Sequence, residues 1–205
     1  MSRRAVFLDR DGVINSYVYN PEFGTVDSPS IPDEFQLISG VSEAIRALRS
    51  MGLLVIVVSN QPGIAKGKFT PELLDATTAK MLEECGHNID DVYYCLHHPQ
   101  ATNLRYLADC ACRKPKPGLL LQAAANWEID IPASFMVGDG LTDVLAGRAA
   151  GARTILVSAR KCYLCEEIAK YDATPDFLAA NLVAAVDIIR AQQDQPSTML
   201  RSLTR

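Results

Sequence analysis

The stretch Ala5-Val6-Phe7-Leu8-Asp9-Arg10-Asp11-Gly12 decides the fold. Its apolar residues show no helical period and end abruptly in two carboxylates, which is typical of a strand buried on both faces of a parallel sheet. Ligands of open α/β sheets bind just beyond the carboxyl ends of the strands. Side chains two residues apart on an extended segment point the same way, so Asp9 and Asp11 can face one site. Such a pair suits Mg²⁺, and a simple capped turn is the alternative.

The composition is that of one ordinary globular domain. The chain has 205 residues, 48% hydrophobic and 21% charged, which allows one sizeable core. The formal net charge of −4 argues against a general nucleic-acid or membrane-surface binder. Because we find neither a membrane-span-length apolar run nor a signal-peptide core, we expect a cytoplasmic protein whose cysteines are thiols or metal ligands. We also expect a monomer. We expect a single domain over residues 1–192 and a mobile tail over residues 193–205.

Strand-like and helical segments alternate along the chain. Apolar strands are expected at residues 5–8, 53–58, 92–96, 134–138 and 154–157. Helices are expected at residues 41–51 and 71–85, from residue 118, at residues 140–150 and over most of residues 177–191. Residues 13–36 are expected to form a long loop, which is often functional. The alternation predicts an α/β fold with a doubly wound parallel sheet and helices on both faces.

Polar groups follow several of these strands, and the carboxyl ends of parallel strands meet at one rim. The groups are Asp9 and Asp11, Ser59 and Asn60, Asp139 with Asp143, and Lys114 after the third strand. Acids with a metal, one hydroxyl and one lysine are the groups needed for phosphoryl transfer. One aspartate can attack phosphorus, a second acid can protonate the leaving oxygen and activate water, and the lysine and hydroxyl can hold the phosphoryl oxygens.

These segments resemble, in order, the four motifs of the haloacid-dehalogenase-like phosphatases. The motifs are Asp9-Arg10-Asp11-Gly12, Ser59-Asn60, Lys114, and Gly138-Asp139 with Asp143, and the resemblance extends from Ala5 to about Ile189. It implies a Rossmann-like fold with Asp9 as nucleophile and Asp11 as general acid/base. It also implies Mg²⁺ held by the Asp9 side chain, the Asp11 backbone carbonyl and Asp139. Ser59 and Lys114 would hold the transferred phosphoryl group.

A cysteine-rich insert at about residues 95–112 predicts a structural zinc site. Cys95, His97, Cys110 and Cys112 offer three sulfurs and one nitrogen, with 12 residues between the two pairs, and this set suits a closed tetrahedral site. The alternative is three buried cysteines and a surface histidine. His98 competes with His97, but the family pattern favours His97. Cys85 is left over, and Cys162 and Cys165 have the spacing of a redox or metal pair but are expected to be structural.

Zinc-loop members of the family include heptose-1,7-bisphosphate 7-phosphatases and histidinol-phosphate phosphatases. Residues 59–61, 63–69 and 94–100 resemble the heptose enzymes, which implies a small phosphorylated sugar as substrate and loss of the 7-phosphate of D-glycero-D-manno-heptose 1,7-bisphosphate. The candidate substrate-binding residues are Asn15, Asn60, Gln61, Lys66 and Arg113. The guanidinium of Arg113 suits a second phosphate. Three departures weaken the substrate assignment: a longer loop after Asp11, Gly140 in place of a frequent lysine, and Pro62 in place of a small polar residue.

Two other function classes use similar residues. A phospho-acceptor signalling domain also has acids at strand ends, a hydroxyl and a lysine, but Asp11 and the long loop over the site favour turnover. A zinc-dependent nucleic-acid binder would explain Arg113, Lys114 and Lys116, but the acidic overall charge argues against it. We therefore expect neither a nucleic-acid nor a membrane partner.

Overall fold

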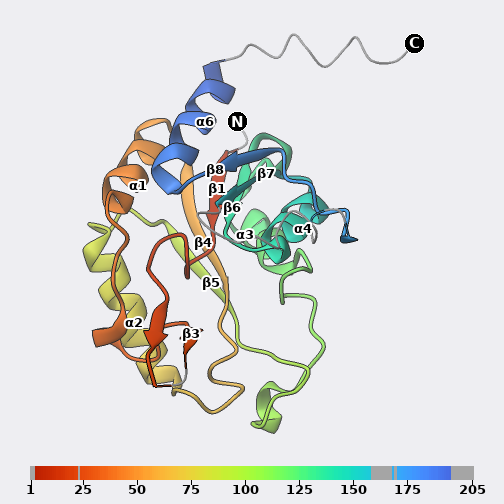
Figure 1. Ribbon diagram of the computed structural model, residues 1–205. Helices are drawn as coiled ribbons and strands as arrows, with labels where there is room; N and C mark the ends of the chain where they lie inside the picture. Colours follow the sequence, from red (N-terminus) through yellow and green to blue (C-terminus); the bar gives the residue numbers. More distant parts are fainter. Residues whose placement is uncertain (1–2, 23, 158–167, 169, 195–205) are drawn as a thin grey trace.

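The computed structural model describes residues 3–22, 24–157, 168 and 170–194 (Figure 1). Six parallel strands form one sheet in the spatial order β5-β4-β1-β6-β7-β8. Their bounds are β1 Ala5–Leu8, β4 Leu54–Asn60, β5 Asp91–Cys95, β6 Phe135–Gly138, β7 Arg153–Val157 and β8 Phe177–Ala179. The helices are α1 Val41–Ser50, α2 Pro71–Glu84, α3 Gly118–Trp127, α4 Leu141–Ala150 and α6 Leu182–Asp194. This arrangement confirms the predicted α/β fold.

Helices cover both faces of the sheet (Figure 1). Because side chains alternate along β1, Val6 and Leu8 pack into one core with α1, α2 and α6. Ala5 and Phe7 point to the other core, which α3 and α4 complete. All four residues of β1 are fully buried, as expected for a central strand of a parallel sheet.

Local signals explain where the helices begin and which side they bury. The buried residues of α1 recur at helical spacing, since Val41, Ala44, Ile45 and Leu48 face the core. The Thr70 side chain caps α2 by accepting a hydrogen bond from the Leu73 amide, and Pro71 occupies the first helical position. None of the helices in the described ranges is long and apolar enough to cross a membrane.

Two segments differ from the sequence prediction. Residues 13–36 are not only a loop, because β2 Val18–Asn20 pairs antiparallel with β3 Thr25–Asp27. The helix expected over most of residues 177–191 is confirmed as α6, but the strand β8, which the sequence did not predict, precedes it. β8 is three residues long and forms the edge of the sheet with Leu178 exposed, so it lacks the long apolar run of a central strand.

The predicted tail and one cysteine pair fall largely outside the structure. Helix α6 continues to Asp194, whereas residues 195–205 lie outside the described residues. Cys162 and Cys165 also lie outside them, so their predicted structural role stays a prediction.

Three short 3-10 helices complete the described elements. They are η1 Pro32–Glu34, η2 Leu104–Tyr106 and η3 Ile131–Ala133. The first lies in the segment after the hairpin, the second in the cysteine-rich insert, and the third just before β6.

Candidate active site and metal-binding loop

Three carboxylates meet at the carboxyl ends of β1 and β6. Asp9 follows β1, Asp139 follows β6, and Asp143 lies in the first turn of α4. Each of the three offers an oxygen within 4.8 Å of the others. We call Asp9, Asp139 and Asp143 the acid trio. Mg²⁺ prefers carboxylate oxygens and keeps places for water and phosphate, so the trio fits the metal that the sequence predicted.

Lys114 lies against the acid trio. Its Nζ is 3.0 Å from Asp9 Oδ1 and 2.5 Å from Asp143 Oδ1, and it donates a hydrogen bond to the Val58 carbonyl at 2.9 Å. Burial alone would lower the pKa of Lys114, but attraction to Asp143 and Asp9 more than reverses this, so its pKa lies above the ordinary value. Lys114 therefore stays a cation where a phosphoryl group would meet Asp9.

Asp143 is a buried carboxyl with an altered pKa. Burial, together with the nearby charges of Asp9 and Asp139, raises the pKa of Asp143 to about 7. Its Oδ2 also accepts a hydrogen bond of 3.0 Å from the Gly140 amide at the start of α4. A bound cation would favour the charged form of this carboxyl.

Two motif glycines allow the acids to approach one another. Gly12 has a φ of +82°, and a Cβ there would lie 2.5 Å from the Asp139 Oδ2. A Cβ on Gly138 would lie 2.2 Å from the Asp143 Cβ. Only glycine fits both places without moving a trio carboxylate.

The Asp11 carboxylate has a different set of neighbours from the Asp9 carboxylate. It accepts hydrogen bonds from Arg10, Asn15 and Gln61. Among the described residues it does not join the acid trio. β1 ends at Leu8, the Asp9 amide still donates to the Val137 carbonyl at 2.9 Å, and the chain bends at Arg10. That Asp9 and Asp11 face one site stays a prediction. Burial would raise the pKa of Asp11, but the adjacent Arg10 guanidinium outweighs it and holds that pKa below its usual range.

Ser59, Asn60 and Gln61 lie at and just after the end of β4. The Ser59 hydroxyl is buried and accepts a hydrogen bond of 3.2 Å from Gln61 Nε2. The Asn60 side chain bonds both to the Lys114 amide and to the Lys114 carbonyl, each at 3.0 Å. Asn60 thereby fixes the backbone that carries Lys114, and its predicted contact with substrate stays a prediction.

Further cationic groups lie beside the site. Arg113 is half-buried and donates to the His97 carbonyl at 3.3 Å, while Lys66 is exposed. Burial and the charges of Arg113 and Lys66 lower the pKa of His98, so both cations lie near this histidine. A region with two cations suits an anionic group of a ligand.

The hairpin β2–β3 lies against residues 62–69. Asp27 forms an ion pair with Lys68. A small cavity of about 60 Å³ lies between the two segments and is lined by Asp27, Ser28, Gln61, Pro62, Gly63, Lys66, Lys68 and Phe69. The longer loop after Asp11 thus contributes a wall next to residues of the predicted substrate region.

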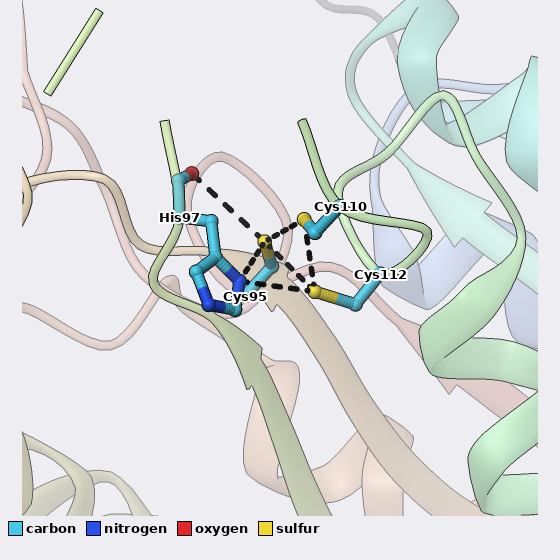
Figure 2. Close-up of side chains that lie close together, drawn as sticks. All are labelled: Cys95, His97, Cys110 and Cys112. Atoms are coloured by element: carbon cyan, nitrogen blue, oxygen red, sulfur yellow. Dashed lines mark hydrogen bonds between the residues drawn. The ribbon is translucent and has the colours of Figure 1, made fainter. Parts of the chain in front are cut away.

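The cysteine-rich insert brings its four predicted ligands together (Figure 2). The three Sγ atoms are 3.1 to 3.5 Å apart, and His97 Nδ1 is 3.4 Å from Cys112 Sγ. Tetrahedral zinc with Zn–S bonds of about 2.3 Å needs sulfurs about 3.8 Å apart, so small shifts would accommodate the ion. Cys95 ends β5 and Cys112 directly precedes Arg113. The cluster could therefore hold a metal such as zinc and fix the segment that carries Lys114.

Curated relatives resemble most of the chain. It is 43% identical over 164 residues to the D-glycero-beta-D-manno-heptose-1,7-bisphosphate 7-phosphatase of Pasteurella multocida, which covers 78% of this chain and 84% of that protein. The enzyme of the same name from Vibrio cholerae is 45% identical over 167 residues with the same coverage. A family model described as HAD-hydrolase-like matches residues 111–185. The chain belongs to the haloacid-dehalogenase-like hydrolase family.

Solved structures agree with the family assignment. A crystal structure of D,D-heptose 1,7-bisphosphate phosphatase from B. bronchiseptica, complexed with magnesium and phosphate, has a TM-score of 0.74 at 27% identity. The superposition covers 92% of this chain and 99% of the B. bronchiseptica chain. A putative HAD-like phosphatase from Mesorhizobium loti has a TM-score of 0.69 at 29% identity and covers 92% and 88%.

Three residues of this haloacid-dehalogenase-like site have a position that the sequence analysis did not predict. Asp143 was quoted with its motif, and the structure adds it to the acid trio. Tyr17 donates a hydrogen bond of 3.0 Å to Asp139 Oδ2, and burial together with Asp139 raises the pKa of Tyr17. Arg10 is fully buried beside Asp11. The position of Arg10 between two motif acids is the one feature of the sequence that could have indicated its role, because a charged residue next to a buried strand needs a charged partner.

Proposed function

We propose that the chain is a Mg²⁺-dependent phosphatase that forms an aspartyl-phosphate at Asp9. The observation that carries this proposal is the contact of the Lys114 ammonium with Asp9 and Asp143 beside Asp139. This contact supports the proposal because it brings the proposed nucleophile, a cation and a proposed metal ligand together at the carboxyl ends of the strands. Mg²⁺ held by the acid trio, with the Asp11 carbonyl as a further ligand, would neutralise charge on the phosphoryl oxygens when bound.

The residues of this chain can carry out two successive displacements at phosphorus. The Asp9 carboxylate attacks, the bond to the sugar oxygen breaks, and Asp11 supplies the proton to that oxygen. Water then attacks the same phosphorus, the bond to Asp9 breaks, and Asp11 takes the proton of the water. Lys114 and the Ser59 hydroxyl would hold the phosphoryl oxygens throughout.

We propose that the substrate is D-glycero-D-manno-heptose 1,7-bisphosphate and that the 7-phosphate is removed. The names of the curated relatives support this, and they specify the β anomer. The electropositive region around Arg113 and Lys66 supports a substrate with a second phosphate. Histidinol phosphate has no second phosphate, so it is the weaker candidate.

We further propose Zn²⁺ as the ion of the cysteine-rich insert. A site with four protein ligands and no open position is typical of a structural role. The monomeric state and the cytoplasmic location expected from the sequence stay predictions, and sedimentation of the purified protein would test the first of them.

The substitution Asp9→Asn tests the mechanism. We expect phosphate release to fall at least about a thousand-fold, because an amide cannot serve as the nucleophile. The melting temperature and the zinc content should stay near those of the wild type. Substantial residual turnover, or stable phosphoprotein without turnover in the wild type, would contradict the proposal. Rates on heptose bisphosphate, histidinol phosphate and hexose phosphates, measured side by side, test the substrate.

A further inference from the structure

A buried polar network surrounds the Asp11 carboxylate. Arg10 and Asn15 are fully buried, Gln61 is 1% exposed and Asp11 is 6% exposed. Oδ1 of Asp11 accepts from Arg10 Nε and Asn15 Nδ2, each at 3.0 Å. Oδ2 accepts from Gln61 Nε2 at 2.9 Å and from Arg10 Nη2 at 3.3 Å. We call these four residues the Asp11 network.

The network leaves the carboxylate one orientation. Arg10 can only donate and an ionised Asp11 can only accept, so the Gln61 amide must turn its oxygen to Arg10 and its nitrogen to Asp11. Gln61 Oε1 accepts from Arg10 Nη2 at 3.0 Å. Gln61 thus bridges the arginine and the acid. Each carboxylate oxygen has two donors, and the longest of the four hydrogen bonds, 3.3 Å from Arg10 Nη2, goes to Oδ2, so Oδ2 is the oxygen that can give up a donor and accept a proton from water.

Stability does not explain the network. A buried ion pair costs desolvation of both charges, and an apolar pair of similar volume is often at least as stable. Here the guanidinium of Arg10 has no exposed surface and lies 5.8 Å from the Tyr94 ring centroid. The hydroxyl of Tyr94 is in turn 3.0 Å from the Thr78 hydroxyl. Such an arrangement holds a geometry, and the group that it holds is Asp11.

We propose that Arg10 and Gln61 are positioning residues that aim the Asp11 carboxylate at the water that hydrolyses the Asp9 phosphate. This inference rests on the proposed function. In that step the oxygen of water bonds to phosphorus, the bond between phosphorus and Asp9 breaks, and the water proton passes to Asp11. In this role Arg10 and Gln61 act through Asp11, because the hydrogen bonds that they donate to its carboxylate favour the ionised form, which accepts the proton.

The substitution Gln61→Leu tests the proposal with 4-nitrophenyl phosphate. The constant kcat/KM reports only the steps up to and including phosphoryl transfer to Asp9, whereas kcat also depends on the later hydrolysis of the phosphoenzyme. We expect kcat to fall about 10-fold or more while kcat/KM changes less than about threefold. Phosphoenzyme should accumulate, which a rapid-quench experiment would detect as a burst of nitrophenolate approaching one per chain. A merely destabilised fold would lower the burst instead.

A second variant and a matched control separate the network from other effects. Gln61 also donates to Ser59, so its substitution changes more than the contact with Asp11. Arg10→Lys leaves Ser59 unchanged and removes the two hydrogen bonds from the guanidinium to Asp11. It should lower kcat and leave kcat/KM nearly unchanged, as Gln61→Leu does. Ser134→Ala removes buried hydrogen bonds to the Ala5 amide and the Asp130 carbonyl at the opposite end of the sheet. Its kcat and kcat/KM should stay unchanged.

The outcomes distinguish the inference from the proposed function. Equal losses in kcat and kcat/KM in both variants, a loss without accumulated phosphoenzyme, or unchanged kinetics would each overturn the positioning role. Failure of the wild-type protein to release phosphate from any phosphate ester would overturn the proposed function instead. If Gln61→Leu does not fold, Arg10→Lys alone decides, since it conserves charge and volume.

Discussion

At the scale of single residues, Asp143 should make the stability of the protein depend on pH. A carboxyl whose folded-state pKa lies above the unfolded value contributes stability that is full at low pH and lost as the pH rises through the folded value. Because burial and the charges of Asp9 and Asp139 raise the pKa of Asp143 from 3.8 to about 7, magnesium-free wild type should lose melting temperature relative to Asp143→Asn as the pH rises from about 4 to about 7, and the difference should level off at higher pH.

Thermal unfolding over this pH range, in buffer without divalent cations, measures the difference between the two proteins. Asp187→Asn serves as the control, since the Asp187 side chain is exposed, and its difference from wild type should not change with pH in this way. A difference between wild type and Asp143→Asn that is the same at every pH would contradict the interpretation. Added Mg²⁺ should reduce the effect, because a cation favours the charged carboxyl.

At the same scale, the sequence predicted which residue types meet but not how each is oriented. Asp9, Asp139, Ser59 and Lys114 could be placed because they follow strands whose ends must share one rim. The neighbours of Asp11 could not be placed. β1 ends at Leu8 and the chain bends at Arg10, so the alternation rule alone does not orient Asp11. The bridge through Gln61 also joins segments 50 residues apart.

At the scale of the element, the cysteine-rich insert should depend for its order on the zinc proposed for it. Leu104 and Leu107 of the insert are exposed, and its ligands adjoin Arg113 and Lys114. Cys110→Ser should therefore lower the bound zinc from one per chain toward zero and reduce the melting temperature, because metal binding supplies folding free energy. Phosphatase activity should fall with it, since the insert holds Lys114 in place.

Metal analysis of the purified proteins measures the first effect. Cys85→Ala is the matched control, because Cys85 is a buried cysteine of the α2 side of the core and lies outside the cluster. It should keep its zinc. Full zinc content in Cys110→Ser would rule out this ligand set.

Among the other elements, the sequence predicted the long ones and missed the short ones. Central strands such as β4 contain continuous apolar runs. Such runs can be recognised in the sequence without knowing how the side chains pack. β2, β3 and β8 have three residues each. Strands this short depend on their tertiary partners, and both residues Val26 and Leu178 are exposed, so no periodicity marks them.

For the whole molecule, the sheet joins two cores that should unfold together. Neighbouring residues of β1 belong to opposite cores, Phe7 to the side of α3 and Leu8 to the side of α1. Phe7→Ala should lower the free energy of unfolding by about 3–5 kcal/mol, since Phe7 is fully buried. Leu121→Ala on the exposed side of α3 should change it by less than about 0.5 kcal/mol, because Leu121 is 47% exposed.

The single tryptophan lets denaturant unfolding test this cooperativity. Trp127 packs against the core that contains Phe7, so its fluorescence reports that side, whereas far-ultraviolet circular dichroism reports the helices on both sides. Because no residue of β1 can leave one core without disturbing the other, the two signals should change at the same denaturant concentration in wild type and in Phe7→Ala. A fluorescence change in Phe7→Ala that clearly precedes the loss of helix would mean that the α3 side unfolds alone, and that the central strand does not couple the two cores.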